Sequence, residues 1–229
     1  MEEKYIEIFK INWKYNLLPH IIITALLCIL APFIMGVKNL DDTLTAKVLE
    51  LYISLFGIIL LTPLFIPDQD RSIRELLESK RVSMVVHHCV RLLAAFGVLI
   101  IAITSFLVFL KLQGCSFPFN DYLYGTIATS IFLGGMGVLV YSISDNLPVS
   151  YMIPIIYYIS CYGGRGRFFG KFYLFTMGYS DISIKNYIMI AGMLMIAIGV
   201  VFRNIRLCKK INIAKSWVNN KKFKCRKIN

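Results

Sequence analysis

The sequence predicts an all-α, polytopic membrane protein with six transmembrane helices, and three observations support this class. Of the 229 residues, 57% are hydrophobic and only 17% are charged, with a mean hydropathy of +0.67, whereas a soluble domain of this length needs a more polar surface. Six apolar stretches approach the roughly 20 residues that a membrane-spanning helix requires. They are continuous rather than alternating, which disfavours β-barrel strands. Within one domain, 1–229, the predicted spans are 17–37, 46–66, 92–112, 122–143, 147–162 and 187–203.

Residues 1–16, before the first span, have the pattern of an interfacial helix. Their polar residues share one helical face, and apolar and aromatic residues occupy the other, as in helices that lie in a membrane surface. An ordinary amphipathic start to the first span would explain the same pattern. The first span, 17–37, is expected to be retained, because its apolar run is too long for a signal peptide and no small-residue cleavage site follows.

The second, third and fourth spans are apolar with few exceptions. The second, 46–66, carries Glu50 near its end, where the carboxylate could stay among the lipid headgroups. The third and fourth contain no Asp, Glu, Lys or Arg apart from Lys111 at an end. The fourth also contains a Gly-Gly-x-Gly cluster at 134–137, which allows a neighbouring backbone to approach closely. Packing is one interpretation of this cluster, and a hinge is the other.

The fifth span is the least certain of the six. It is short, contains Pro148 and Pro154, and continues into the glycine- and aromatic-rich stretch 163–186. That stretch is expected to lie outside the cell, and the sixth span, 187–203, follows it.

The distribution of Lys and Arg fits the positive-inside rule if the N-terminus is cytoplasmic. Three precede the first span, five lie in 67–91 and ten follow residue 202, whereas seven lie in the segments then placed outside. Five crossings would put the ten-charge tail outside, so the bias favours six crossings and two cytoplasmic termini. The tail, 204–229, is expected to rest on anionic inner-leaflet lipid, so the net charge of +12 does not indicate nucleic acid as a partner.

Isolated polar residues elsewhere favour structural roles. His87-His88-Cys89 invites a metal interpretation, but adjacent histidines on a helix point about 100° apart, so a loop-to-helix junction at the headgroups is expected instead. His20 in the first span lies near its inner end, and a headgroup position is favoured over a cavity. No catalytic cluster, Asp-rich metal motif or Gly-x-Ser-x-Gly elbow stands in the sequence.

Six cysteines occur singly along the chain, with no Cys-x-x-Cys pair. Unpaired thiols are therefore the expectation. Cys115 and Cys161 both fall near the predicted outer face, so a bridge between them is the alternative.

The charged stretch 67–91 between the second and third spans contains a short amphipathic helix pattern. Ser72-x-x-Glu75 is a capping box, in which each side chain bonds a free backbone N–H of the first turn. Ile73, Leu76 and Leu77 then form one apolar patch. Four basic residues within 71–81 would cost about 10–14 kcal/mol in lipid, so this segment is not buried in the membrane, and the charge bias with six crossings places it in the cytoplasm. A solvated connector is the simpler interpretation.

The sequence "DRSIRELLESKRVS", from Asp70 to Ser83, resembles the corresponding inner loop of membrane subunits of ABC transporters of the ABC-2 (type V exporter) class. The order of spans, the short loop between the fourth and fifth, and the long outer stretch before the sixth are similar to that class as well. The usual Gly-Thr after the Arg is replaced by Ser72-Ile73.

The resemblance implies a role for this loop and for several partners. Its helix would be the cytoplasmic coupling helix, which docks on a separate ABC ATPase subunit, and 163–186 would form an outer re-entrant segment. ATP and Mg would be bound by that ATPase, because "GGRGRFFGKF" has Arg165 where a phosphate loop needs Gly and Phe172 where it needs Ser or Thr. A second permease copy, or a homologous permease, would complete the pathway. The coupling residues would be Asp70, Arg71, Ser72, Ile73, Arg74, Glu75, Leu76, Leu77 and Glu78.

The expected function is thus that of a permease, not an enzyme, in a bacterial plasma membrane. It would export an amphipathic or hydrophobic substrate such as an antimicrobial peptide, in contact with membrane lipids. The alternative is a non-transport immunity or sensor protein that binds a peptide or lipid without moving it. Such a protein would not need a coupling helix.

Overall fold

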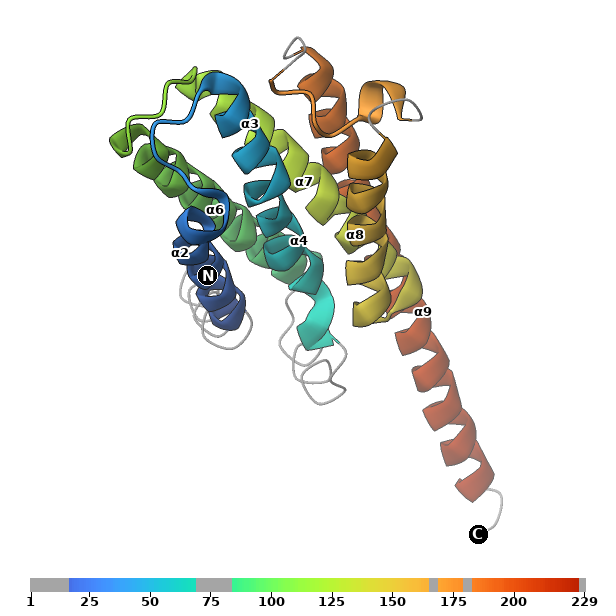
Figure 1. The fold of residues 1–229 in the computed structure, drawn as a ribbon. Helices are drawn as coiled ribbons and strands as arrows, with labels where there is room; N and C mark the ends of the chain where they lie inside the picture. The colour runs from blue at the N-terminus through green and yellow to red at the C-terminus, as the bar shows by residue number, and fades with distance from the viewer. Residues whose placement is uncertain (1–16, 69–83, 165–168, 179–182, 227–229) are drawn as a thin grey trace.

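Helices make up every regular element in the described part of the chain, with no strand among them. The computed structural model describes residues 17–68, 84–164, 169–178 and 183–226 (Figure 1). The elements are α2 (Leu18–Met35), α3 (Asp42–Leu51), the 3-10 helix η2 (Ile53–Leu55), α4 (Phe56–Leu61), the 3-10 helix η3 (Thr62–Asp68), α6 (Met84–Leu112), α7 (Phe119–Ser144), α8 (Leu147–Gly164), the 3-10 helix η4 (Gly170–Phe172) and α9 (Ser183–Arg226).

The predicted all-α class is confirmed within these ranges. Five helical stretches are long and apolar enough to cross a membrane, and they correspond to the first four and the last of the predicted spans. α8 occupies the position of the fifth predicted span but is not one of these five stretches. A total of six crossings, with α8 among them, therefore stays a prediction. The predicted interfacial helix, 1–16, and the coupling residues, Asp70–Glu78, lie outside the described residues.

The second predicted span is a broken helix. A 3-10 turn, η2, separates α3 from α4, and Ser54 beside this break donates its hydroxyl hydrogen to the carbonyl of Glu50 at 2.5 Å. Such a bond from a serine side chain to the preceding turn competes with regular helix geometry. Two prolines, Pro63 and Pro67, fall in η3, where each lacks the N–H that an α-helix would use.

α7 is the centre of the bundle and packs against α4, α8 and α9. Glycines let the helix axes approach: a Cβ at Gly134 would meet the carbonyl oxygen of Gly57 on α4, and one at Gly135 would meet that of Gly192 on α9. The packing interpretation of the glycine cluster is therefore confirmed, while the hinge stays a prediction.

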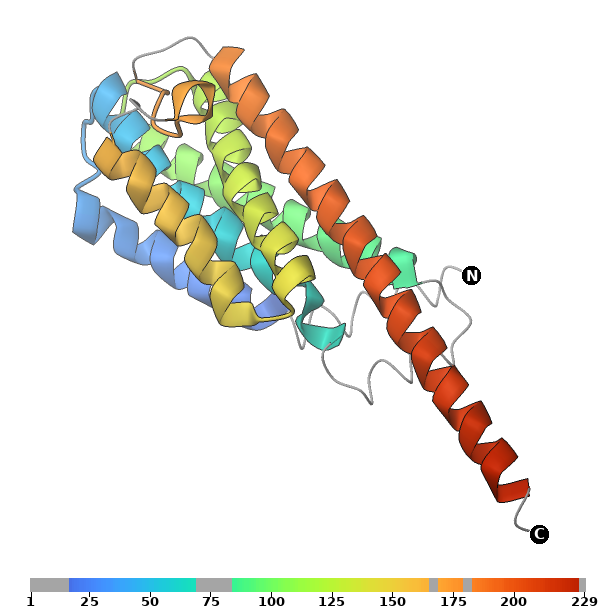
Figure 2. The ribbon, with the colours of Figure 1, turned by 90° about the vertical axis from the view of Figure 1, so that its right-hand side faces the viewer.

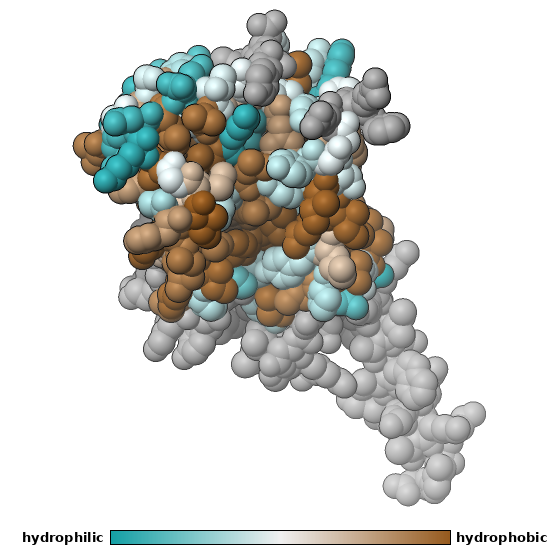
Figure 3. Space-filling model, viewed as in Figure 1, coloured by the Kyte–Doolittle hydropathy of each residue, from teal (hydrophilic) through white to brown (hydrophobic). Residues whose placement is uncertain are grey.

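The outer surface of the bundle is strongly apolar. Only 11% of the α2 stretch is buried, compared with 72% for α7, and exposed isoleucines and leucines also cover α8 and α9. Figure 3 shows apolar side chains across the middle of one face, with polar ones toward its upper end. Contiguous apolar surface of this extent is unsuited to water and suits contact with lipid.

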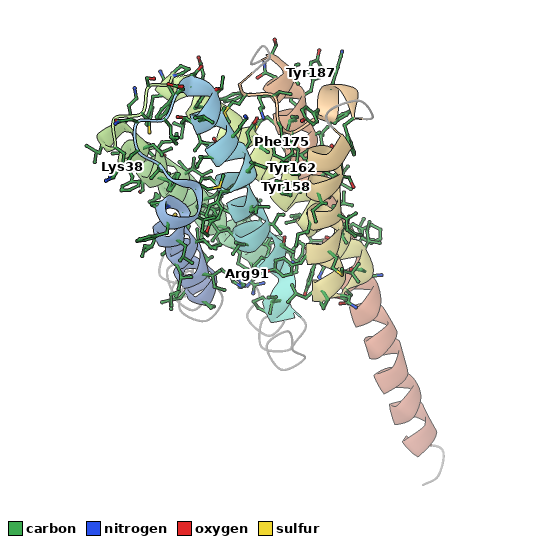
Figure 4. The ribbon with its side chains drawn as sticks, in the orientation of Figure 1. Lys38, Arg91, Tyr158, Tyr162, Phe175 and Tyr187 are labelled. Atoms are coloured by element: carbon green, nitrogen blue, oxygen red, sulfur yellow. The ribbon has the colours of Figure 1, made fainter. Side chains whose placement is uncertain are left out.

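The two ends of the bundle differ in their polar residues. Arg91 lies toward the lower end of the bundle in Figure 4, which is here called the basic end. Arg203 on α9 lies 5.5 Å from the ring of Phe65 on η3, which in turn contacts His88 near the start of α6. α9 continues beyond that end as one helix to Arg226 (Figure 2), so the basic tail is largely helical. The opposite end carries the start of α3 and the segment 173–178.

Candidate functional site

The predicted coupling segment leaves and re-enters the bundle at the basic end. η3 ends at Asp68 and α6 begins at Met84, and side chains just inside those two points touch. The ring of Phe65 on η3 meets His88 on α6 edge to face, with 5.0 Å between the ring centroids. The two helices that flank the charged loop are therefore in direct contact where the loop departs.

Arg203 on α9 joins the same cluster, which is here called the basic-end cluster (Phe65, His88, Tyr141, Asp145 and Arg203). Its guanidinium lies 5.5 Å from the Phe65 ring and 5.7 Å from the Tyr141 ring, and it bonds Asp145 at 2.5 Å. A buried guanidinium flanked by rings and paired with a carboxylate is held by both cation–π and charge-assisted contacts. The basic-end cluster thereby ties η3, α6, α7 and α9 together.

His87 and His88 lie in the first turns of α6, at the predicted junction of loop and helix, but they are buried rather than exposed. Their exposed fractions are 1% and 0%, and Arg91 one turn later is also buried. The ring of Phe65 on η3 packs against His88. Within the described ranges, no three His, Cys, Asp or Glu residues gather as metal ligands would.

The opposite end contains a buried ion pair that the sequence did not suggest. Lys185 Nζ lies 2.7 Å from Glu50 Oε1, and the two side chains are only 2% and 4% exposed. The ammonium also donates to the hydroxyl of Thr129 at 3.1 Å and to the carbonyl of Leu174 at 2.6 Å. All three of its hydrogens therefore have an acceptor, which is what makes a buried lysine tolerable.

The same Glu50 oxygen fixes the segment between α8 and α9. It accepts hydrogen bonds from the backbone N–H groups of Thr176 and Met177 at 3.0 and 2.9 Å. Together with Lys185, these bonds hold residues 174–177 against α3, α7 and α9. The pair and its backbone partners are here called the Glu50 clasp.

A cavity of about 700 Å³ lies beside the Glu50 clasp, a size within the range of small-molecule sites. α3 forms one wall, the end of α8 a second and the segment 173–178 a third. Figure 4 shows Tyr158, Tyr162 and Phe175 grouped in this region. The lining residues are Thr43, Ala46, Lys47, Glu50, Leu51, Tyr162, Gly163, Tyr173, Phe175 and Gly178.

Aromatic contacts stiffen the cavity wall. Phe175 makes edge-to-face contacts with Tyr158, Tyr162 and Tyr173, with centroids 5.4 to 5.9 Å apart. The Tyr158 hydroxyl donates to the Leu51 carbonyl at 2.6 Å, which links α8 to α3. Edge-to-face pairs of this kind add stability beyond simple burial.

The pairing of Glu50 with Lys185 replaces two separate expectations. Glu50 was expected at headgroup level and Lys185 in an outer loop, whereas the structure buries both, with Lys185 inside α9. The available signal was charge: an acid near the start of the second predicted span and a base just before the last one. Opposite charges at the same membrane depth are candidates for a pair.

The cysteines, the start of α3 and His20 are the other polar positions of interest. Cys115 and Cys161 are free thiols, so the alternative of a bridge is not realised, and both are buried. α3 begins at Asp42, and Thr45 bonds back to the Asp41 carbonyl there. His20 is half-buried in the first turn of α2.

Comparisons with protein families, with curated proteins and with solved structures found no match to this chain.

Proposed function

We propose that this protein is the permease subunit of an ATP-driven ABC transporter, in which the charged loop between η3 and α6 carries force from a separate ATPase. The observation that carries the proposal is the amphipathic pattern of Ser72 to Leu77, joined to the bundle at the basic-end cluster. A short helix with one apolar patch and charged flanks has the composition of a helix that docks in a groove of another protein.

The basic-end cluster supplies a path from that loop to the rest of the bundle. Movement of the loop acts directly on η3 and α6, because these elements flank it. Phe65 and His88 are in contact, and Arg203 connects the same place to α7 and α9. ATP binding shifts the equilibrium between two arrangements of the helices only if the ATPase dimer binds one of them more tightly.

The proposed topology has six crossings, with α8 as the fifth. α8 is a helix whose side chains at Met152, Ile156 and Ile159 are largely exposed, as lipid-facing residues are. It starts beside Asp145 in the basic-end cluster, whereas α9 starts at the end where the cavity lies. If α8 crosses the membrane, the two chain termini and the charged loop lie on the same side of the membrane. The charge bias assigns that side to the cytoplasm.

The proposed cargo is an amphipathic or hydrophobic molecule such as an antimicrobial peptide. Within the apolar stretches of the described helices, the exposed side chains are mostly hydrophobic and few are ionisable, and this composition suits such a cargo better than a small ion. Two copies, or this chain with a homologous permease, would enclose the pathway and recruit two ATPase subunits.

The test is co-purification with the ATPase from the native host. The double substitution Leu76→Asp and Leu77→Asp places two charges in the apolar patch, so the ATPase should be lost from the complex. The matched control, Ser116→Asp with Asn120→Asp, adds the same charge at exposed positions of the opposite end and should retain it. Undiminished recovery of the ATPase with the leucine variant would contradict the proposal.

The same experiment separates the non-transport alternative. An immunity or sensor protein that binds a peptide or lipid has no use for an ATPase, and its purified complex should contain no nucleotide-hydrolysing subunit.

A further inference from the structure

The cavity beside the Glu50 clasp has an asymmetric charge. Among the described residues, two charged side chains line it, Glu50 and Lys47. The Glu50 carboxylate is neutralised by the Lys185 ammonium and receives two backbone N–H groups as well. Lys47 is exposed, and the described residues supply it with no ion pair. Within the described part of the lining, the charge left to act on a bound molecule is therefore the Lys47 ammonium.

The rest of the lining is apolar or aromatic. Leu51 and Ala46 lie on α3, and Tyr162 and Phe175 face them from α8 and from the segment 173–178. Aromatic rings next to a cation suit a molecule with an apolar body and a negatively charged group. A fully apolar molecule would leave Lys47 unused, and a cationic one would meet a like charge.

The Glu50 clasp keeps this wall in place. Tyr173 and Phe175 flank Leu174, whose carbonyl accepts from Lys185, and Thr176 and Met177 donate to Glu50. Leu174, Thr176 and Met177 thus each bond to the buried pair, and Phe175 lies between them in the chain. The pair is a positioning device for the aromatic wall, while Lys47 is free to contact the ligand.

We infer that the cavity binds an anionic amphiphile, with its apolar part between α3 and the aromatic wall and its carboxylate or phosphate on Lys47. The inference goes beyond the proposed function and is independent of it, because the cavity lies at the opposite end of the bundle from the end of η3 and the start of α6. The same chemistry is offered by an anionic phospholipid of the surrounding membrane and by a soluble anionic amphiphile.

The experiment uses the full chain in phosphatidylcholine nanodiscs and two photoreactive probes. One is a diazirine-bearing dodecanoate, and the other is its uncharged methyl ester. Labelled residues are mapped by mass spectrometry. The carboxylate probe should label the α3, α8 and 173–178 walls saturably, and it should do so more strongly than the ester.

Lys47→Gln should weaken labelling of the walls by the carboxylate about fivefold, which is the upper range for a solvent-accessible ion pair. The matched control is Lys38→Gln, an exposed lysine that does not line this cavity and lies away from Tyr162 and Phe175 in Figure 4. Its labelling should equal that of the unmodified chain. Both positions are exposed, so neither substitution should disturb the fold.

Adding phosphatidylglycerol to the nanodiscs distinguishes the two sources. Competition with the probe assigns the site to anionic membrane lipid, and undiminished labelling assigns it to a soluble amphiphile; either result supports an anionic ligand. Equal labelling by the two probes, or labelling insensitive to Lys47→Gln, would overturn the inference. Neither outcome bears on ATPase co-purification, so the two proposals fail separately.

Discussion

At the scale of single residues, the ion pair of Glu50 and Lys185 is the most constrained feature of the molecule. Each charge lies inside the bundle, and each has several hydrogen-bonding partners in addition to the other. Removal of one partner from such a pair leaves the other buried and uncompensated, which is more costly than removal of both.

This predicts a strongly non-additive double-mutant cycle. Glu50→Gln and Lys185→Met should each destabilise the protein by about 3–5 kcal/mol. The double variant should lose less stability than either single variant does. Thermal unfolding of the purified protein in nanodiscs, with Lys38→Met as an exposed control, measures the coupling. Additive losses would show that the two charges do not compensate each other.

Arg203 offers a second test at this scale, because its contacts require a planar group. Arg203→Lys retains the charge but loses the stacking on Phe65 and Tyr141, so a loss of about 1–2 kcal/mol is expected. Arg206→Lys on the same helix is the comparison, since Arg206 lies over one ring only, that of Phe202 at 5.9 Å, and donates to the Ser142 carbonyl at 3.2 Å. Its loss should be smaller, and an equal loss in both variants would mean that the second ring at Arg203 contributes nothing.

At the scale of elements, the bundle depends on close contacts of α7 with α4 and α9. Ser142 on α7 donates to the Gly199 carbonyl of α9 at 2.7 Å, a bond that requires the two backbones to be near each other. Gly57 contributes from α4, where an added Cβ would overlap the backbone carbonyl of Ser130. A backbone atom cannot move aside as a flexible side chain can, so the helices themselves would have to separate.

Alanine at two glycines should therefore have opposite effects. Gly57→Ala should destabilise the protein by about 1–3 kcal/mol through overpacking. Gly97→Ala on α6, where nothing lies within 4 Å of the added carbon, should be neutral or stabilise it by about 0.5–1 kcal/mol. Detergent-resistance assays at increasing temperature compare the two. A stable Gly57→Ala variant would show that α4 and α7 are not packed as described.

At the scale of the whole molecule, the number of crossings decides which side carries the tail. With α8 as the fifth span, a cysteine at exposed Lys171 should react with an impermeant maleimide from outside, in a variant that lacks the six natural cysteines. A cysteine in place of Glu78 or at the C-terminus should react only after the membrane is opened. Five crossings would instead expose the C-terminus to the outside reagent.

The sequence by itself determined the helical class and the positions of the apolar helices. Continuous apolar runs satisfy their backbone groups internally as helices in lipid, and this is a local property of each segment. Charge bias along the chain likewise supports an orientation without knowledge of contacts. Broken helices such as α3–α4 were less visible, because Ser54 and the prolines act on geometry that hydropathy does not measure.

Only the tertiary structure decided which polar residues meet. Glu50 and Lys185 are 135 residues apart, and neither neighbourhood in the sequence reveals the other. His87 and His88 were expected at the headgroups, and only the structure shows that both are buried, with Phe65 of η3 against His88. The cavity likewise combines α3, α8 and the segment 173–178, so it exists only once these are packed. Pairings of this kind depend on how the helices are placed in three dimensions. The glycines of α7 contribute to that placement, because they allow α4 and α9 to pack closely against it.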